Sequence, residues 1–98
     1  MKRDVFRFLN EPREMPAKVP LPLRTDGDWN ELYGSFGDRQ AAHQADRCLD
    51  CGNPYCEARC PVHNYIPNWL KLVQEGRVLE AAALCHETNP LPEMCGRV

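Results

Sequence analysis

Four of the six cysteines lie close together, at Cys48, Cys51, Cys56 and Cys60, and Pro61 follows the last of them. Their spacing is C-x2-C-x4-C-x3-C-P. Thiolates are ligands for soft and borderline metals. Two thiolates three residues apart can bind one centre when a tight turn points both sulfurs to the same side. The run therefore predicts a metal or iron–sulfur site.

The end of the run favours iron–sulfur chemistry. In the bacterial run C-x2-C-x2-C-x3-C-P, the cysteine before the proline ligates a different cluster from the other three. The same ending occurs here, although the middle spacing is four residues rather than two. By this analogy the first three cysteines share one cluster and Cys60 belongs to a second. Gly52 and Pro54 would let the backbone curl, so that its amides can hydrogen-bond the cluster sulfurs.

Two other interpretations stay open on spacing alone. A four-cysteine zinc site commonly pairs two well-separated C-x2-C knuckles, which suits this run less well. An even number of cysteines also allows disulfides or simple thiols. However, the apolar stretch Val5–Leu9 is short and broken by Arg7, so it is no secretory signal. No apolar run approaches a membrane span. We therefore expect a cytoplasmic protein, in which thiols stay reduced.

The composition excludes several classes of function. The chain has 12 basic and 14 acidic side chains and a formal net charge of -2, which argues against nucleic-acid and membrane partners. It has no glycine-rich nucleotide loop and no recognisable nucleophile–base pair, so no catalytic residue is assigned. Only about one residue in five is Leu, Ile, Val or Phe. We therefore expect a single domain with a small hydrophobic core, which needs a metal or a partner to stabilise it.

The elements that precede the run are short. We expect a helical turn over Asp4–Asn10 and an extended arm over Met15–Pro22, because proline lacks an N–H and biases the preceding residue to extended geometry. A further short helix is predicted from apolar residues at helical spacing, which would form local core: Trp29, Leu32, Tyr33 and Phe36. A longer helix over Asp38–Arg47, capped by Ser35 or Asp38, leads into the first cysteine.

The elements that follow are predicted to be a loop and two helices. The loop spans Cys48–Pro61. One helix begins near Pro67 and is stopped by Gly76. The other runs from Val78 to about Thr88, with a stripe that includes Leu79, Ala82 and Cys85. No alternating strand pattern is present. The prediction is therefore an all-α chain.

Two cysteines and three histidines remain. Cys85 lies on an apolar stripe and is interpreted as a small buried hydrophobe. Cys95 is open between ligand and bystander. The histidines, none at metal-pair spacing, are interpreted as solvated or hydrogen-bonded rings, although the one in the loop after Cys60 could also shield a cluster: His43, His63 and His86.

Two segments carry a family resemblance. Ala45–Cys56 (ADRCLDCGNPYC) and Cys60–Trp69 (CPVHNYIPNW) closely resemble the N-terminal iron–sulfur domain of bacterial glutamate synthase small (beta) subunits. The later stretches Gly76-Arg77, Thr88–Glu93 and Gly96–Val98 fit the same family. The module is also similar to the N-terminal domain of dihydropyrimidine dehydrogenase. The resemblance covers nearly the whole chain and is looser over the arm.

The resemblance implies an alpha-helical ferredoxin-like domain with two [4Fe-4S] clusters. Residues matching Cys48, Cys51 and Cys56 ligate one cluster, and the residue matching Cys60 ligates the other. The remaining ligands follow the stretch that matches Gly96–Val98, and the position of Cys95 is not a ligand. Downstream family domains bind FAD and NADPH. Electrons pass from NADPH through FAD and the clusters to the large (alpha) subunit, which reduces 2-iminoglutarate to glutamate.

The resulting hypothesis is an electron-relay and subunit-docking domain of an NADPH-dependent glutamate synthase, not catalytic alone. We expect residues 1–37 to be an arm with short helices. Residues 38–98 would be the cysteine-rich domain, truncated at its C-terminal end and unable to hold two complete clusters. The alternatives are a zinc-stapled interaction module, or the same domain from another flavin-dependent reductase such as dihydropyrimidine dehydrogenase.

Overall fold

The regular secondary-structure elements of the described part of the chain are all helices. The computed structural model describes residues 4–25 and 29–97, and these ranges contain short α-helices and no β-strand. This confirms the all-α prediction. In chain order the helices are α1 (Arg7–Asn10), α2 (Leu21–Arg24), α3 (Asp38–Ala45), α4 (Tyr55–Arg59), α5 (Ile66–Gln74), α6 (Val78–Thr88) and α7 (Pro92–Arg97).

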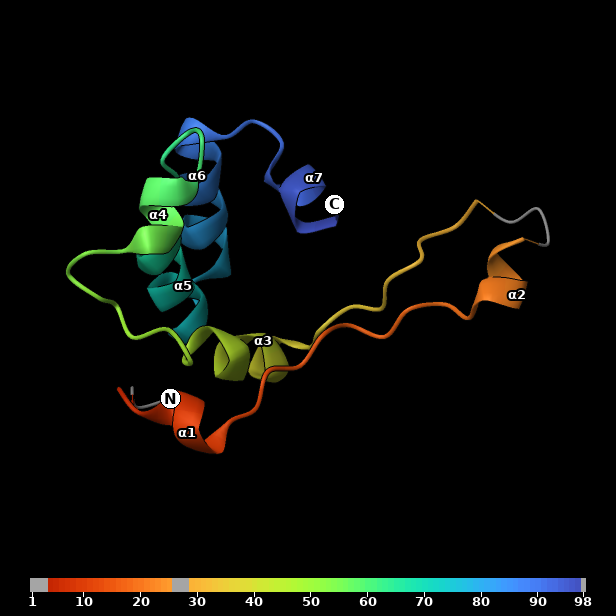
Figure 1. Cartoon of the computed structure of the whole chain (residues 1–98), viewed down its shortest axis with the longest axis horizontal. Helices are drawn as coiled ribbons and strands as arrows, with labels where there is room; N and C mark the ends of the chain where they lie inside the picture. Colours follow the sequence, from red (N-terminus) through yellow and green to blue (C-terminus); the bar gives the residue numbers. More distant parts are fainter. Residues whose placement is uncertain (1–3, 26–28, 98) are drawn as a thin grey trace.

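Helix α5 is the centre of the helical body, where it contacts α3, α4 and α6 (Figure 1). It has a proline in its first turn and ends at Gln74, just before the predicted stop at Gly76. Gly76 has a φ of +83°. Its N–H donates to Val73 O at 3.0 Å, and the N–H of Arg77 donates to Leu72 O at 2.9 Å. This paired closure reverses the chain and lays α6 alongside α5.

The buried core is small. The buried hydrophobic residues among those described are Ala45 and Ala81. Polar side chains share the interior: Asp46, Asn64 and Gln74. The predicted stripe on α6 is wrong at Leu79, which is 88% exposed, whereas Ala81 is the buried residue of this helix. Leu79 and Ala81 are both compatible with helical spacing, so the pattern alone could not choose the buried face.

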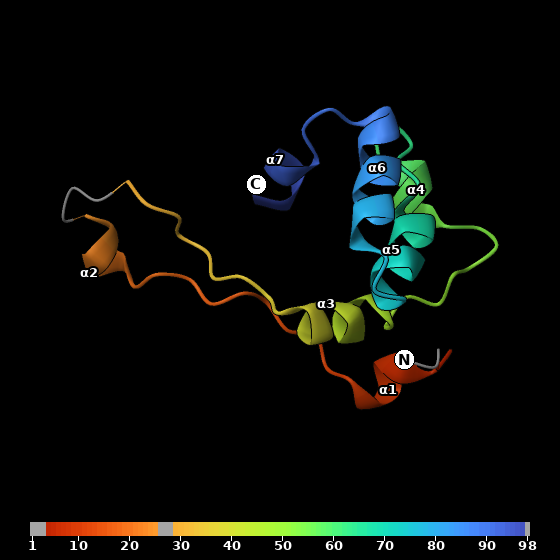
Figure 2. The same cartoon turned by 180° about the vertical axis from the view of Figure 1, so that it is seen from behind.

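An extended arm leaves the helical body between α1 and α3 and turns back on itself near α2 (Figures 1 and 2). Lys18 and Tyr33 form an isolated antiparallel bridge. Val19 N–H donates to Leu32 O at 2.8 Å, and Gly34 N–H donates to Ala17 O at 2.7 Å. The two sides of the arm thus satisfy part of each other's backbone.

This pairing corrects the prediction of a short helix around the aromatic residues. The described part of that segment is extended, and Trp29 is 98% exposed rather than core. Backbone groups of Leu32 and Gly34 instead hydrogen-bond the facing side of the arm. The predicted arm also extended two residues too far, because Leu21 and Pro22 already belong to α2. Proline is tolerated there, since a first-turn N–H has no helical partner.

Side chains from α3 hold the base of the arm. Gln44 donates from Nε2 to Pro12 O at 3.0 Å and accepts at Oε1 from the Glu14 N–H at 3.1 Å. Gln40 donates to the Glu14 carboxylate at 2.8 Å. Neither Ser35 nor Asp38 caps α3, because Gly37 is its N-cap and no side-chain capping bond forms. Asp38 lies in the first turn instead.

No helix in the described ranges is long and apolar enough to cross a membrane.

Candidate iron–sulfur site

The cysteine run lies between α3 and α5 and contains a helix. Cys48 follows the end of α3, Cys51 is in the loop, Cys56 is within α4, and Cys60 is the C-cap of α4. The prediction of an uninterrupted loop was therefore wrong. Pro54 provides the N-cap of α4, while Glu57 in its first turn and Arg59 in its last both suit the helix dipole.

The first knuckle is a tight turn centred on an aspartate. Asp50 has a φ of +52°, and its N–H donates to Cys48 Sγ at 3.4 Å. Gly52 was expected to provide the backbone freedom, but it has no positive φ. Aspartate is one of the few residues with a side chain that enters the left-handed region readily. The sulfur of Cys48 thus already accepts an amide hydrogen bond of the kind that tunes clusters.

The turn after Cys60 surrounds its sulfur with backbone amides. Backbone hydrogen bonding from the amides of Asn64, Val62 and His63 holds the pKa of Cys60 below its usual value, and burial opposes it. The N–H of His63 also donates to the carbonyl oxygen of Cys60 at 3.0 Å. His63 has a φ of +48°, which helps to turn successive amides inward. A lowered pKa favours the thiolate of Cys60, the form that binds metal. We call these three amides the Cys60 cradle.

The two remaining cysteines have different surroundings. Burial raises the pKa of the Cys85 thiol, and the smaller effect of a hydrogen bond from the Asn64 side chain lowers it. Cys85 also lines an apolar hollow of about 330 Å³ between α5, α6 and α7. These features agree with its interpretation as a packing residue. Cys95 is exposed and accepts a hydrogen bond of 3.5 Å from Asn89 Nδ2.

The thiols are not gathered into a preformed metal site. Within residues 4–25 and 29–97, no group of three or more His, Cys, Asp or Glu side chains is arranged to hold a metal ion. No disulfide links the six cysteines, all of which are in these ranges. Cys51 and Cys56 are exposed, and Cys48 and Cys60 are half-buried. The donor types and the amides around two of the sulfurs fit an iron–sulfur cluster.

Two buried polar atoms lie just before the first cysteine. Asp46 Oδ1 and Arg47 Nε lack a hydrogen-bond partner in the described part of the chain. The other oxygen of Asp46 accepts from Arg7 at 2.8 Å. A buried polar atom without a partner is costly. Further polar contacts to these two atoms would therefore be stabilising. Both atoms lie in the segment that leads into Cys48.

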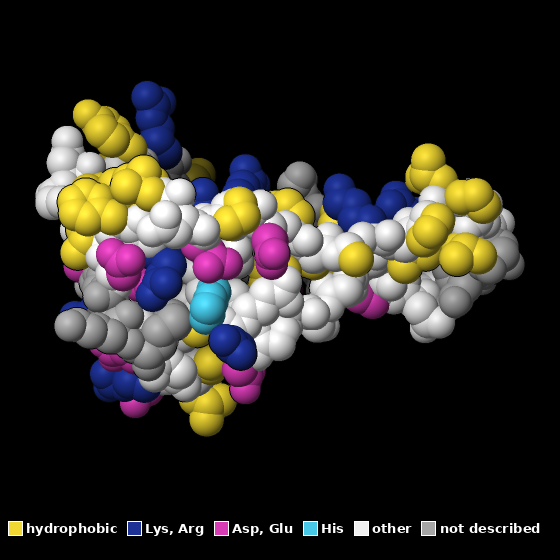
Figure 3. Space-filling view, turned by 90° about the horizontal axis from the view of Figure 1, so that it is seen from below, with side chains coloured by type: hydrophobic (Ala, Val, Ile, Leu, Met, Phe, Trp, Pro, Cys, Tyr) yellow, Lys and Arg dark blue, Asp and Glu magenta, His cyan; other side chains and the backbone are white. Residues whose placement is uncertain are grey.

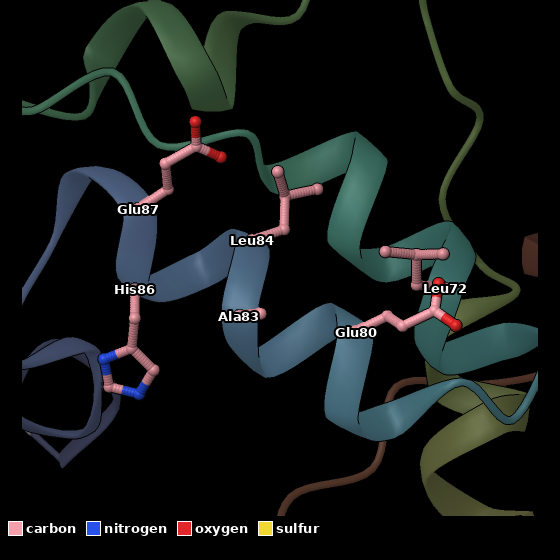
Figure 4. Close-up of a pocket in the computed structure, with 6 residues that line it drawn as sticks. All are labelled: Leu72, Glu80, Ala83, Leu84, His86 and Glu87. Atoms are coloured by element: carbon pink, nitrogen blue, oxygen red, sulfur yellow. The ribbon is translucent and has the colours of Figure 1, made fainter.

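The histidines do not converge on the run. His43 Nδ1 lies 3.4 Å from the Glu11 carboxylate, and His63 Nδ1 lies 3.4 Å from the carbonyl oxygen of Glu57. His63 is exposed, and so is His86. The larger hollow in Figure 4, of about 480 Å³, runs along α6 and contains no cysteine. There His86 points away from Glu80 and Glu87.

Sequence reasoning missed Asn64 as a site residue. Its side chain is buried between α5 and α6, and its backbone N–H belongs to the Cys60 cradle. The only signal was a polar residue between the last cysteine of the run and the buried Pro67.

Comparison with known proteins agrees with this site. The family described as dihydropyrimidine dehydrogenase domain II, 4Fe-4S cluster, matches residues 25–98. The chain belongs to this family of iron–sulfur domains. It is 58% identical over 98 residues to the glutamate synthase [NADPH] small chain of Escherichia coli K12, covering 100% of this chain and 21% of that protein.

Other relatives show the same pattern. The glutamate synthase [NADPH] small chain of Halomonas elongata is 57% identical over 93 residues, which is 95% of this chain and 20% of that protein. The putative oxidoreductase UacF of E. coli K12 is 39% identical over 99 residues, covering 90% of this chain and 16% of the relative. The chain thus spans about a fifth of the length of the curated relatives it matches most fully.

Proposed function

We propose that this chain is the electron-relay iron–sulfur domain of an NADPH-dependent glutamate synthase small subunit. In this role it passes electrons from FAD and NADPH domains to the large subunit, where glutamate is made. The observation that carries the proposal is the cysteine run from Cys48 to Cys60, together with the family match that covers it. Bound [4Fe-4S] clusters would supply one-electron transfer, and the protein sets their position and potential.

The residues of the run would divide between two clusters. Cys48, Cys51 and Cys56 are proposed as ligands of one, and Cys60 as a ligand of the other. Each cluster needs four thiolates or their equivalents, and the sequence has six cysteines. The 98-residue chain alone is therefore expected to bind fewer than two complete clusters.

The arm is proposed to contact the large subunit. Its far end carries exposed apolar side chains, with Leu21 at 69%, Leu23 at 58% and Trp29 at 98% exposure. Hydrophobic side chains gather at this end in Figure 3. Exposed apolar clusters of this kind are typical of protein–protein contacts. The domain boundary at residue 37 and a cytoplasmic location remain part of the same proposal.

Metal analysis tests the proposed function. The full-length protein, prepared anaerobically, should contain iron and acid-labile sulfide in equal amounts and absorb in the visible range. One zinc per chain without sulfide would replace the proposal by a zinc-stapled interaction module. With the large subunit present, NADPH oxidation that depends on glutamine and 2-oxoglutarate is expected. Oxidation that depends instead on a pyrimidine would identify another reductase of the family.

A further inference from the structure

Asp46 lies in the turn that leads into Cys48. It is the C-cap of α3, its side chain is fully buried, and its N–H donates to Ala42 O at 3.0 Å. The N–H of Cys48 donates to Ala45 O at 3.1 Å. The N–H of Asp50 then donates to Cys48 Sγ at 3.4 Å. Hydrogen bonds therefore connect the end of α3, where Asp46 is buried, to the sulfur of Cys48.

The counterion of Asp46 comes from α1. Arg7 Nε lies 2.8 Å from Asp46 Oδ2, and the two residues are 39 apart in the sequence. Within residues 4–25 and 29–97, the other carboxylate oxygen, Oδ1, is buried and accepts no hydrogen bond. Compensation of this buried charge therefore depends on Arg7. Removal of one partner of a buried ion pair leaves an uncompensated charge, which is strongly destabilising.

The segment that carries Arg7 is attached to α3 by other contacts as well. Gln44 of α3 donates to Pro12 O at 3.0 Å and accepts from the Glu14 N–H at 3.1 Å. Arg7 thus approaches the buried carboxylate from a segment that α3 already holds. The ion pair can therefore restrict the turn into Cys48 rather than merely follow its movement.

We propose that Arg7 and Asp46 are positioning residues for the cluster that Cys48 ligates. The buried ion pair fixes the end of α3, and with it the turn in which the Asp50 N–H meets the sulfur of Cys48. Hydrogen bonds to ligand sulfurs are one of the factors that set the reduction potential of a cluster. The N-terminal segment thereby takes part in setting this potential, although it contains no cysteine. The inference rests on the proposed ligation by the first three cysteines of the run.

The test uses the full-length protein with its clusters loaded. Cys51→Ser first identifies the electron paramagnetic resonance signal of the cluster in question. The midpoint potential of that signal and hydrogen–deuterium exchange over residues 46–50 are then measured in Arg7→Ala, in Asp46→Asn and in the double variant that combines them. The controls change an exposed arginine of the N-terminal segment and an exposed aspartate of α3: Arg13→Ala and Asp38→Asn.

Arg7→Ala should shift the midpoint of the Cys51-dependent signal to a more negative potential and speed exchange over residues 46–50. The reason is that the uncompensated carboxylate disturbs the turn and weakens the hydrogen bond to the Cys48 sulfur, which favours the reduced cluster. The double variant should recover most of the midpoint, because no buried charge is then left without a partner. The two controls and the Cys60-dependent signal should stay unchanged.

Selective loss of the Cys51-dependent cluster in Arg7→Ala, with recovery in the double variant, gives the same support. An unchanged or more positive midpoint in Arg7→Ala, or unchanged exchange over residues 46–50, would overturn the inference. Equal shifts of both clusters, or loss of both together, would also overturn it. So would a shift that Asp46→Asn does not reduce, because Arg7 would then act by a route other than Asp46.

The same experiment separates this inference from the proposed function. If Cys51→Ser leaves both signals intact, the proposed ligation fails and the inference fails with it. If Cys51→Ser removes one signal while Arg7→Ala keeps its midpoint, only the role of the ion pair is rejected.

Discussion

Arg7 Nε donates a hydrogen bond of 2.8 Å to Asp46 Oδ2, although 39 residues separate the two in the sequence. The Asp46 side chain is fully buried at the end of α3, two residues before Cys48. The carboxylate raises the pKa of Arg7 above its usual value. The contact ties α1 to the segment that delivers the first cysteine.

Replacing Arg7 should release α1. In Arg7→Ala, the buried Asp46 carboxylate would lose its cation, and such a loss is strongly unfavourable. We expect faster hydrogen–deuterium exchange over residues 4–11 and a lower Tm. Arg13→Ala, which removes an exposed arginine of the same segment, is the control. Exchange and Tm that match the control would show that the ion pair does not hold α1.

The turn between α5 and α6 depends on Gly76. Its φ of +83° is unfavourable for a side chain, although a Cβ would meet no atom within 4 Å. Gly76→Ala should therefore lower the free energy of unfolding by about 1 kcal/mol through backbone strain alone. Gly96→Ala, at an open site without positive φ, is the control and should not destabilise. Denaturant unfolding followed by circular dichroism measures both, and equal stabilities would contradict the assignment.

The pKa shifts of two cysteines predict opposite pH dependences of alkylation. The lowered pKa of Cys60 keeps its thiolate at lower pH, so its reaction with iodoacetamide should persist as the pH falls. The raised pKa of Cys85 moves its reaction to higher pH. Peptide mapping by mass spectrometry of metal-free protein, labelled across a pH series, gives both midpoints. A Cys60 midpoint at or above that of Cys85 would be inconsistent with the cradle.

Binding to the large subunit tests the proposal that the arm is part of the interface. Leu21→Glu with Leu23→Glu should weaken binding of the small subunit to the large subunit at least tenfold and leave the iron content unchanged, because the arm end is remote from the run. Leu79→Glu changes a leucine that is 88% exposed on α6 and serves as the control. Affinity is measured by titration calorimetry. Equal affinities for the arm variant and the control would remove the arm from the interface.

Local features were predictable from the sequence. The all-helical class, the helix over Val78–Thr88 and its start after Gly76 follow from periodicity and from the glycine stop, which act over a few residues. The spacing of the run identifies the cysteines without any structure. The α4 helix was missed because it is a single short turn embedded between prolines and cysteines.

Long-range contacts were not predictable. The pairing of the arm, the Arg7–Asp46 ion pair and the bond from Asn64 to Cys85 join residues far apart in the chain. A pattern of residue types says which side chains can make such bonds, but it does not say which partner the fold supplies. The cradle was anticipated only in general form, as amides near cluster sulfurs, and at Gly52 rather than after Cys60.

The main proposal is that Cys60 serves a different cluster from the three cysteines before it. It is tested most directly by electron paramagnetic resonance of the reduced full-length protein in Cys51→Ser and Cys60→Ser, with Cys85→Ser as the control. We expect Cys51→Ser and Cys60→Ser to perturb two different cluster signals and Cys85→Ser to perturb neither. Loss of one and the same signal in Cys51→Ser and Cys60→Ser would contradict it, because the four cysteines would then hold a single cluster.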